Sequence, residues 1–218
     1  MVIDVSFRVM GNNLPLDHGY SLYSTLSSVL PSVHNAEWLA IHPISGFPVG
    51  GKSLQITDRS RLRLRLPHER LVDVIPLAGK QLVLANASNH FAIRLGVPEA
   101  YTLDPSPVLA SRCVVIKVSE VENSDRSPDR EMFMGALKSQ MTQHGIEGEA
   151  WIDKRRDSRG RELSRRIMHL KGKSIVGYSV RVSDLSDEAS IKLQETGLGG
   201  RHRMGCGIFV PVKARGEQ

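Results

Sequence analysis

Hydrophobic and polar positions in the first half of the chain follow two different periods. Residues 2–10 place apolar side chains at every second position, which predicts a half-buried strand. Residues 20–30 place them at helical spacing, and because Pro31 follows, we expect a helix that ends there. Residues 61–66 alternate arginine with leucine, which predicts a strand with one buried face and one basic face.

Shorter segments complete the predicted order of the first half. Residues 38–42 resemble a short strand, residues 68–77 a second, short helix, and residues 81–93 contain a further strand. The predicted order is therefore strand, helix, strand, strand, helix, strand. That order defines the ferredoxin-like, or split βαβ, unit.

The second half of the chain repeats this order of elements, although the two halves share no sequence repeat. The expected elements are a strand at 109–118, a helix at 131–144, a short strand at 150–152, strand material within 166–182 that can form a hairpin, a short helix carrying Ala189 and Leu193, and a strand at 208–212. Ser183 or Ser186 is expected to cap the last helix, because serine side chains satisfy free amide groups at helix starts.

These patterns together predict an α+β fold of two tandem ferredoxin-like (RRM-like) modules. Each module is expected to have a four-stranded antiparallel sheet and two helices. The expected boundaries are residues 1–96 for the first module, 97–107 for a proline-containing connector and 108–218 for the second module.

Composition and charge narrow the class of partner. The chain carries a formal net charge of +6 and has a sequence pI of about 9.5, which favours a polyanionic ligand. Cys113 and Cys206 form no CxxC or zinc-type spacing, which fits a reducing cytoplasm. Neither a signal peptide nor an apolar run of membrane length is present, so we expect a cytoplasmic protein with no membrane partner.

Glycine and arginine are concentrated at 197–207, between the last predicted helix and the last predicted strand. Glycines let successive amide N–H groups surround a phosphate, which Arg201 and Arg203 can neutralise. The helix–loop–strand order is the reverse of a dinucleotide site or P-loop, and this argues against nucleotide hydrolysis. The alternative to a phosphate-binding site at 197–207 is a solvated hairpin loop without a ligand. The loop residues expected to bind are Gly197, Gly199, Gly200, Arg201, His202, Arg203, Gly205 and Gly207.

A basic segment at 154–173 is the second candidate for contact with a phosphate backbone. Such a contact would make affinity fall with salt, whereas the alternative is a solvated loop. The residues expected to bind here are Arg155, Arg156, Arg159, Arg165 and Arg166.

Three histidines, His18, His34 and His42, lie near the first predicted helix. Histidine can serve as a general acid or base, although a lone histidine is more often structural. No HExxH motif or carboxylate cluster accompanies these histidines, so we expect neither a metal nor another cofactor.

Motifs spread over most of the chain carry a family resemblance. They are LPLDHGY at 14–20 with Leu22 and Tyr23, LPSVH at 30–34, IHPISG at 41–46, LRLP at 64–67, LAGK at 77–80 and the glycine loop ending GCGIFVP at 205–211. Through them the chain resembles the CRISPR-associated repeat-RNA endoribonucleases of the Cas-six (Cas6) group, in particular the type I Myxan branch.

The resemblance implies two ferredoxin-like modules that hold a CRISPR repeat hairpin, with the glycine loop gripping the RNA backbone. It implies cleavage of precursor crRNA at the base of the hairpin, followed by continued attachment to the guide among Cascade subunits. The histidine after the first helix corresponds to His34, assisted by His18 or Tyr20, and Lys52 is the nearest candidate for the family's lysine. Since RNA supplies its own 2′-OH nucleophile, no metal is required, and the expected products are a 2′,3′-cyclic phosphate and a 5′-OH end.

Two other functions remain open at this point. A non-catalytic RNA-binding subunit of a CRISPR ribonucleoprotein would have the same fold, because ferredoxin-like modules host many functions. A small-molecule enzyme with a nucleotide in the glycine loop is disfavoured by the order of elements around that loop and by the 5% aromatic content.

Overall fold

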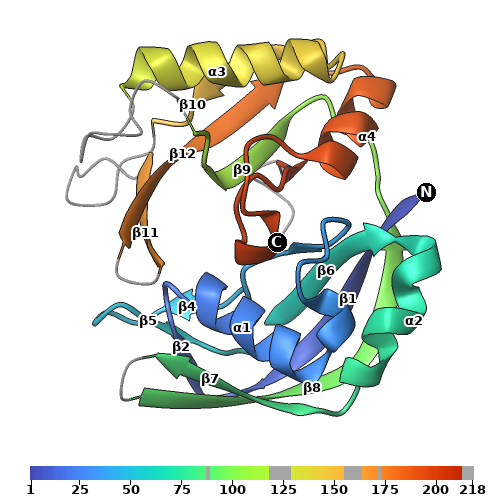
Figure 1. Ribbon diagram of the computed structural model, residues 1–218, viewed down its shortest axis with the longest axis vertical. Coiled ribbons are helices and arrows are strands. Elements are labelled where there is room, and N and C mark those ends of the chain that lie inside the picture. The colour runs from blue at the N-terminus through green and yellow to red at the C-terminus, as the bar shows by residue number, and fades with distance from the viewer. Residues whose placement is uncertain (87–88, 118–128, 155–163, 171–172, 213–218) are drawn as a thin grey trace. The chain divides into compact units, whose positions relative to one another are not determined.

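The computed structural model describes residues 1–86, 89–117, 129–154, 164–170 and 173–212 (Figure 1). The chain divides into two compact units. The N-terminal unit consists of Met1–Leu103 together with His202–Gly205, and the C-terminal unit consists of Asp104–Arg201 and the residues from Cys206 onward. A short segment near the C-terminus therefore belongs to the N-terminal unit, which the expected boundaries of 1–96 and 108–218 did not include.

The N-terminal unit is built around one antiparallel sheet of five strands in the order β3-β6-β1-β8-β7. Its strands are β1 (Val2–Gly11), β2 (Asn13–Pro15), β3 (Ala40–Ile41), β4 (Phe47–Pro48), β5 (Ser53–Gln55), β6 (Arg61–Pro67), β7 (Gln81–Asn86) and β8 (Asn89–Thr102). Its helices are α1 (Gly19–Val29) and α2 (Leu71–Val74), with 3-10 turns η1 (Pro31–Val33), η2 (His68–Arg70), η3 (Ile75–Leu77) and η5 (His202–Met204). The short strands β2, β5 and β4 form a separate three-stranded sheet.

The predicted hydrophobic faces form the core of this unit. Val5 on β1 pairs with Leu64 on β6, and both side chains are fully buried. Leu22 and Leu26 of α1, spaced four residues apart, lie on one face of the helix and pack into the same core. α1 ends at Val29, and Leu30 after it has the extended backbone that is favoured before a proline.

Three details of this unit differ from the expected elements. The strand expected within 81–93 is a hairpin, β7 and β8, so the sheet has five strands where four were expected. β8 continues to Thr102, so the first part of the segment expected to be a connector belongs to the sheet. The helix expected at 68–77 is divided into η2, α2 and η3, with Pro76 in the last turn.

The basic face expected on β6 is partly neutralised by a buried carboxylate. Arg65 donates two hydrogen bonds to Asp4 on β1, from Nε at 2.8 Å and from Nη2 at 3.1 Å. The His42 ring lies beside them, with Nε2 3.7 Å from Asp4 Oδ1. Burial alone would raise the pKa of Asp4, but His42 and Arg65 more than offset burial and hold that pKa well below its usual range. Burial lowers the pKa of His42 below 6.5, although Asp4 opposes this.

The C-terminal unit has the expected order of elements except that three strands, where two were expected, lie between its helices, so its sheet has five strands in place of four. Its elements are β9 (Leu109–Val114), α3 (Arg130–Gln143), β10 (Glu149–Ile152), β11 (Arg165–Leu170), β12 (Lys173–Ser183), α4 (Asp187–Thr196) and β13 (Val210–Pro211). Four strands form an antiparallel path in the order β10-β12-β9-β13, and β11 pairs with β12 as the expected hairpin.

Both helices of the C-terminal unit contribute to one core. Phe133 and Leu137 of α3 and Leu193 of α4 are buried in one cluster with Val180 and Val182 of β12. Ser186 caps α4, because its Oγ accepts the Ala189 N–H at 3.1 Å. The α+β class and its antiparallel sheets are thus confirmed for both units.

Candidate functional site

The turn after α1 presents His34 to solvent. Leu30, Val33 and Ala36 are buried and anchor the turn to the core of the N-terminal unit. His34 and Asn35, which lie between Val33 and Ala36, are exposed. The His34 N–H donates to the Pro31 carbonyl at 3.0 Å. The imidazole of His34 therefore extends from a turn that is fixed on both sides.

Tyr23 of α1 links this turn to the segment His202–Gly205. The Asn35 N–H points to the Tyr23 hydroxyl at 3.5 Å, directly after His34. The guanidinium carbon of Arg203 lies 5.4 Å from the centroid of the Tyr23 ring, within the range of a cation–π interaction. One tyrosine thus contacts both the turn that carries His34 and the arginine of the glycine loop, all within the N-terminal unit.

Two glycines allow the segment His202–Gly205 to lie so close to the N-terminal unit. A Cβ at Gly19, the first residue of α1, would be 2.5 Å from the Met204 carbonyl oxygen. A Cβ at Gly205 would be 2.7 Å from Cγ of Pro43, and the backbone of Gly205 has φ +81, a conformation that favours glycine. A side chain at Gly19 would push the segment, and Arg203 with it, away from α1, and one at Gly205 would push it away from Pro43.

One donor group of the Arg203 guanidinium makes no hydrogen bond within the part of the chain that the structure describes. Its Nη1 is buried and has no hydrogen-bond partner among the described residues. A buried polar atom without a partner costs free energy, and such atoms are usually completed by water or a ligand. Arg203 as a whole is half-buried, and a guanidinium is a group that binds anions such as phosphate. Arg201 is exposed, with φ +66, and His202 is half-buried.

The glycine loop differs from the expected cradle of free amide groups. The N–H of Gly199 donates to Gln140 Oε1 at 2.7 Å, that of Gly200 to the Val115 carbonyl at 2.9 Å, and that of Gly207 to the Cys113 carbonyl at 2.7 Å. Other amides are also engaged, those of Gly197 and Gly205 among them. These N–H groups are already donated within the protein, so anion binding by the loop depends on its arginine side chains. Contact of the loop glycines with a ligand stays a prediction.

His18 has a structural role in the fold. It is 1% exposed, its Nδ1 lies 2.8 Å from the Pro15 carbonyl, and its Nε2 accepts the Ile44 N–H at 3.0 Å. These contacts fix one neutral tautomer and engage both ring nitrogens, so neither is available to a substrate proton. Tyr20 is half-buried in the first turn of α1.

The other candidates lie apart from this tyrosine-centred cluster in the chain. Arg155, Arg156 and Arg159 lie outside the described residues. Arg165 is exposed and Arg166 is half-buried at the start of β11, and their contact with a ligand stays a prediction. Lys52 is exposed between β4 and β5, after the turn glycines 50 and 51.

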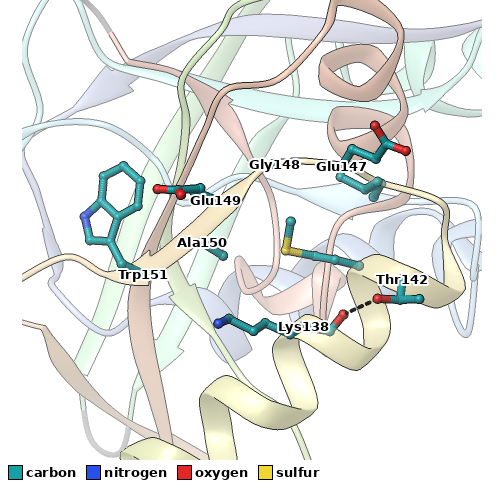
Figure 2. Close-up of a pocket in the computed structure, with 9 residues that line it drawn as sticks. Lys138, Thr142, Glu147, Gly148, Glu149, Ala150 and Trp151 are labelled. Atoms are coloured by element: carbon teal, nitrogen blue, oxygen red, sulfur yellow. Dashed lines mark hydrogen bonds between the residues drawn. The ribbon is translucent and has the colours of Figure 1, made fainter.

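An open groove in the C-terminal unit lies between the end of α3 and β10 (Figure 2). Lys138 and Thr142 line its helix side, with the Thr142 hydroxyl donating to the Lys138 carbonyl at 3.1 Å, and Ala150 lines its strand side. Trp151 and Glu149 project from β10 away from Ala150, as alternation along a strand requires. None of the predicted site residues lines this groove.

Two further observations concern metals and membranes. Within the described ranges, no group of three or more His, Cys, Asp and Glu side chains is arranged to hold a metal ion. Of the helices in those ranges, none is long and apolar enough to span a membrane. Cys113 and Cys206 are both buried, and no disulfide joins them.

Sequence reasoning missed Tyr23 as a site residue. Tyr20 and Tyr23 occupy the same helix, and their spacing alone does not show which of them meets the glycine loop. The LPLDHGY motif ends at Tyr20, whereas the contact with Arg203 is made one turn later. The sequence offered two signals: Tyr23 accompanies the LPLDHGY motif, and it lies beside Leu22, whose helical spacing to Leu26 predicts a core face.

Comparisons with known proteins agree on one family. The family model described as Cas6 Crispr matches residues 3–214. The CRISPR-associated endonuclease Cas6 of Myxococcus xanthus (strain DK1622) is 31% identical over 209 residues, which cover 96% of this chain and 81% of that protein.

Solved structures show the same fold at low sequence identity. A Cas6-related protein from Pyrococcus furiosus matches with a TM-score of 0.69 and 14% identity, covering 99% of this chain and 100% of the other. A RAMP protein that binds different RNA substrates matches with a TM-score of 0.66 and 14% identity, covering 98% of this chain and 100% of the other.

Proposed function

Because the chain belongs to the Cas6 family, we propose that it cuts CRISPR repeat RNA. The substrate is a repeat hairpin in precursor crRNA, and the cut leaves a 2′,3′-cyclic phosphate and a 5′-OH end without a metal. The protein then stays on the guide RNA as a subunit of a Cascade complex. The observation that carries the proposal is the contact of Tyr23 with both Arg203 and the turn that exposes His34.

The Myxococcus relative supports an RNA-cutting activity. That protein is named a CRISPR-associated endonuclease, and the identity of 31% extends over 96% of this chain. The net charge of +6 supports a polyanionic substrate. A hairpin would be held mainly through its shape and its phosphates, since side chains read the deep groove of A-form RNA poorly.

The chemistry requires two proton transfers and one charged contact. The 2′-oxygen forms a bond to the adjacent phosphorus as its proton passes to a base, and the bond from phosphorus to the 5′-oxygen breaks as an acid protonates that oxygen. His34 is one of these two proton-transfer groups. Arg203, which is half-buried, neutralises the charge that develops on the phosphate oxygens.

The experiment compares His34→Ala with His144→Ala on a labelled repeat hairpin. His144 is an exposed histidine at the end of α3 and serves as the matched control. We expect His34→Ala to lose cutting while its Kd for the hairpin stays within about threefold of the parent. His144→Ala should cut normally. Full activity of His34→Ala would refute the assignment.

Two changes to the reaction test the mechanism. Replacement of the 2′-OH at the cut site by hydrogen should stop cutting, because the nucleophile is gone. EDTA should leave the rate unchanged, and the ends should be cyclic phosphate and 5′-OH. Loss of activity in EDTA, or a linear 3′-phosphate formed directly, would contradict this chemistry.

A non-catalytic RNA-binding subunit is the second candidate. It is favoured by the burial of His18, which leaves His34 as the exposed imidazole of the two predicted histidines. End analysis separates the two functions, since a binding subunit would hold the hairpin and produce no new ends.

A further inference from the structure

We propose that Tyr23 is a positioning residue that determines which phosphodiester of the RNA is cut. The inference rests on the proposed function and adds to it a source of cut-site accuracy. Tyr23 is not required to touch the reacting atoms. It acts through two other groups, Arg203 and the turn that carries His34.

The ring of Tyr23 is a rigid support. It extends from α1 and packs against the core cluster of the N-terminal unit, in which the neighbouring residues Leu22 and Leu26 are buried. A tyrosine side chain has two rotatable bonds, and burial of one edge restricts both. A group that packs on this ring is therefore held at a defined distance from α1.

Arg203 rests on the face of the ring, 5.4 Å from its centroid. Cation–π contact uses the flat face of the guanidinium, whereas the N–H groups point outward in its plane. The contact thus orients the donors of Arg203 without consuming them. A phosphate bound by Arg203 would consequently have a defined position relative to α1.

The hydroxyl of Tyr23 contacts the other partner, the Asn35 N–H. Asn35 has φ +59, a left-handed conformation that is unfavourable for residues other than glycine, though asparagine tolerates it best. A hydrogen bond to this N–H favours the strained turn and so fixes the backbone from which His34 extends. Tyr23 therefore sets the distance between a bound phosphate and the imidazole.

The distance between the bound phosphate and the His34 imidazole determines which phosphodiester of the RNA is cut. RNA presents a chain of nearly equivalent phosphodiesters, and only the one beside the imidazole reacts. If Arg203 holds one phosphate and His34 acts near it, a fixed spacing selects one bond. Loss of the spacing permits the strand to shift by one nucleotide while the phosphate contacts elsewhere still hold the hairpin.

The test maps cut positions at nucleotide resolution for Tyr23→Leu, Tyr23→Phe and Arg203→Gln, with Tyr101→Leu as the matched control. Tyr101 is an exposed tyrosine on β8 of the same unit. We expect Tyr23→Leu to cut about 100-fold more slowly in single turnover and to give products one nucleotide away, with Kd within about threefold. Tyr23→Phe keeps the ring and should keep the position, with a loss of about threefold to tenfold in rate. Tyr101→Leu should match the parent protein.

The outcomes are separable. If Tyr23→Leu does not fold, Arg203→Gln still tests the inference, and it should also give displaced cuts. Parental position and rate in both variants would overturn the inference. Equal losses of binding and cutting without displaced products would reduce Tyr23 to a merely structural residue and overturn it as well. A parent protein that cuts no repeat hairpin would instead overturn the proposed function.

Discussion

Replacing Gly19 with alanine should slow RNA cutting although it improves the helix. Gly19 opens α1 and faces the Met204 carbonyl oxygen, and an added Cβ would lie 2.5 Å from that oxygen. Real Cβ atoms essentially never come within 3.0 Å of another heavy atom, so the two segments have to separate. Met204 carries the neighbouring Arg203 with it, away from Tyr23.

The magnitude follows from this displacement. The distance has to grow from 2.5 Å to at least 3.0 Å. A misplacement of about 1 Å can cost about 100-fold in rate, so half of that displacement should cost on the order of tenfold, or about 1.4 kcal/mol of barrier. Alanine within a helix is favoured over glycine by up to about 1 kcal/mol, so this term does not explain a loss of activity.

The assay is single-turnover cutting of a repeat hairpin, with thermal unfolding measured on the same samples. Gly135→Ala is the control, because Gly135 is also helical and an added Cβ there meets nothing within 4 Å. We expect Gly135→Ala to raise the free energy of unfolding by about 0.5–1 kcal/mol and to cut at the parental rate. Gly19→Ala should cut about tenfold more slowly. Parental cutting by Gly19→Ala would show that the position of Met204 has no bearing on the reaction.

Three further predictions concern charge, pH and helix capping. Arg201→Ala should weaken hairpin binding and lower the slope of log affinity against log salt by about 1, as expected for one lost phosphate contact; an unchanged slope removes Arg201 from the interface. Because burial lowers the pKa of His42, the folded state binds fewer protons than the unfolded chain below about pH 6.5 and loses stability as the pH falls. In urea unfolding between pH 7 and pH 5, His42→Gln should therefore show a shallower loss than the parent, and parallel curves would count against this. Ser186→Ala should lower the free energy of unfolding by about 1 kcal/mol through loss of the α4 cap, and no change in the unfolding curve would argue against that cap.

Elements with a strong hydrophobic period could be predicted from the sequence. β1, α1 and β6 were found because their buried faces repeat every two residues or at helical spacing. The sequence predicts one strand within 81–93, where the structure has the β7–β8 hairpin. The apolar runs on either side of Asn86 and Asn89 have the same period, so the turn between them does not change the pattern. The end of β8 was missed because the side chains at 97–102 are mostly exposed and show no clear period.

The candidate site could be predicted only in part, because its contacts join distant parts of the chain. His34 was predicted from the family resemblance and its place after α1; the structure exposes it in that turn, and its role stays a prediction. His18 has the same residue type and a similar place beside the helix, yet Pro15 and Ile44 engage both of its ring nitrogens, which spacing does not reveal. Tyr23 was missed because its partner, Arg203, lies far away in the sequence.

The assignment of His202–Gly205 to the N-terminal unit has a consequence for biosynthesis. During translation the turn with His34 leaves the ribosome well before Arg203, which lies far later in the sequence. A polypeptide interrupted before residue 202 would carry the imidazole and its tyrosine but lack the guanidinium that rests on that tyrosine. Under the proposed function, competence would thus arise only after residue 203 has been made, so that shorter chains remain harmless to cellular RNA.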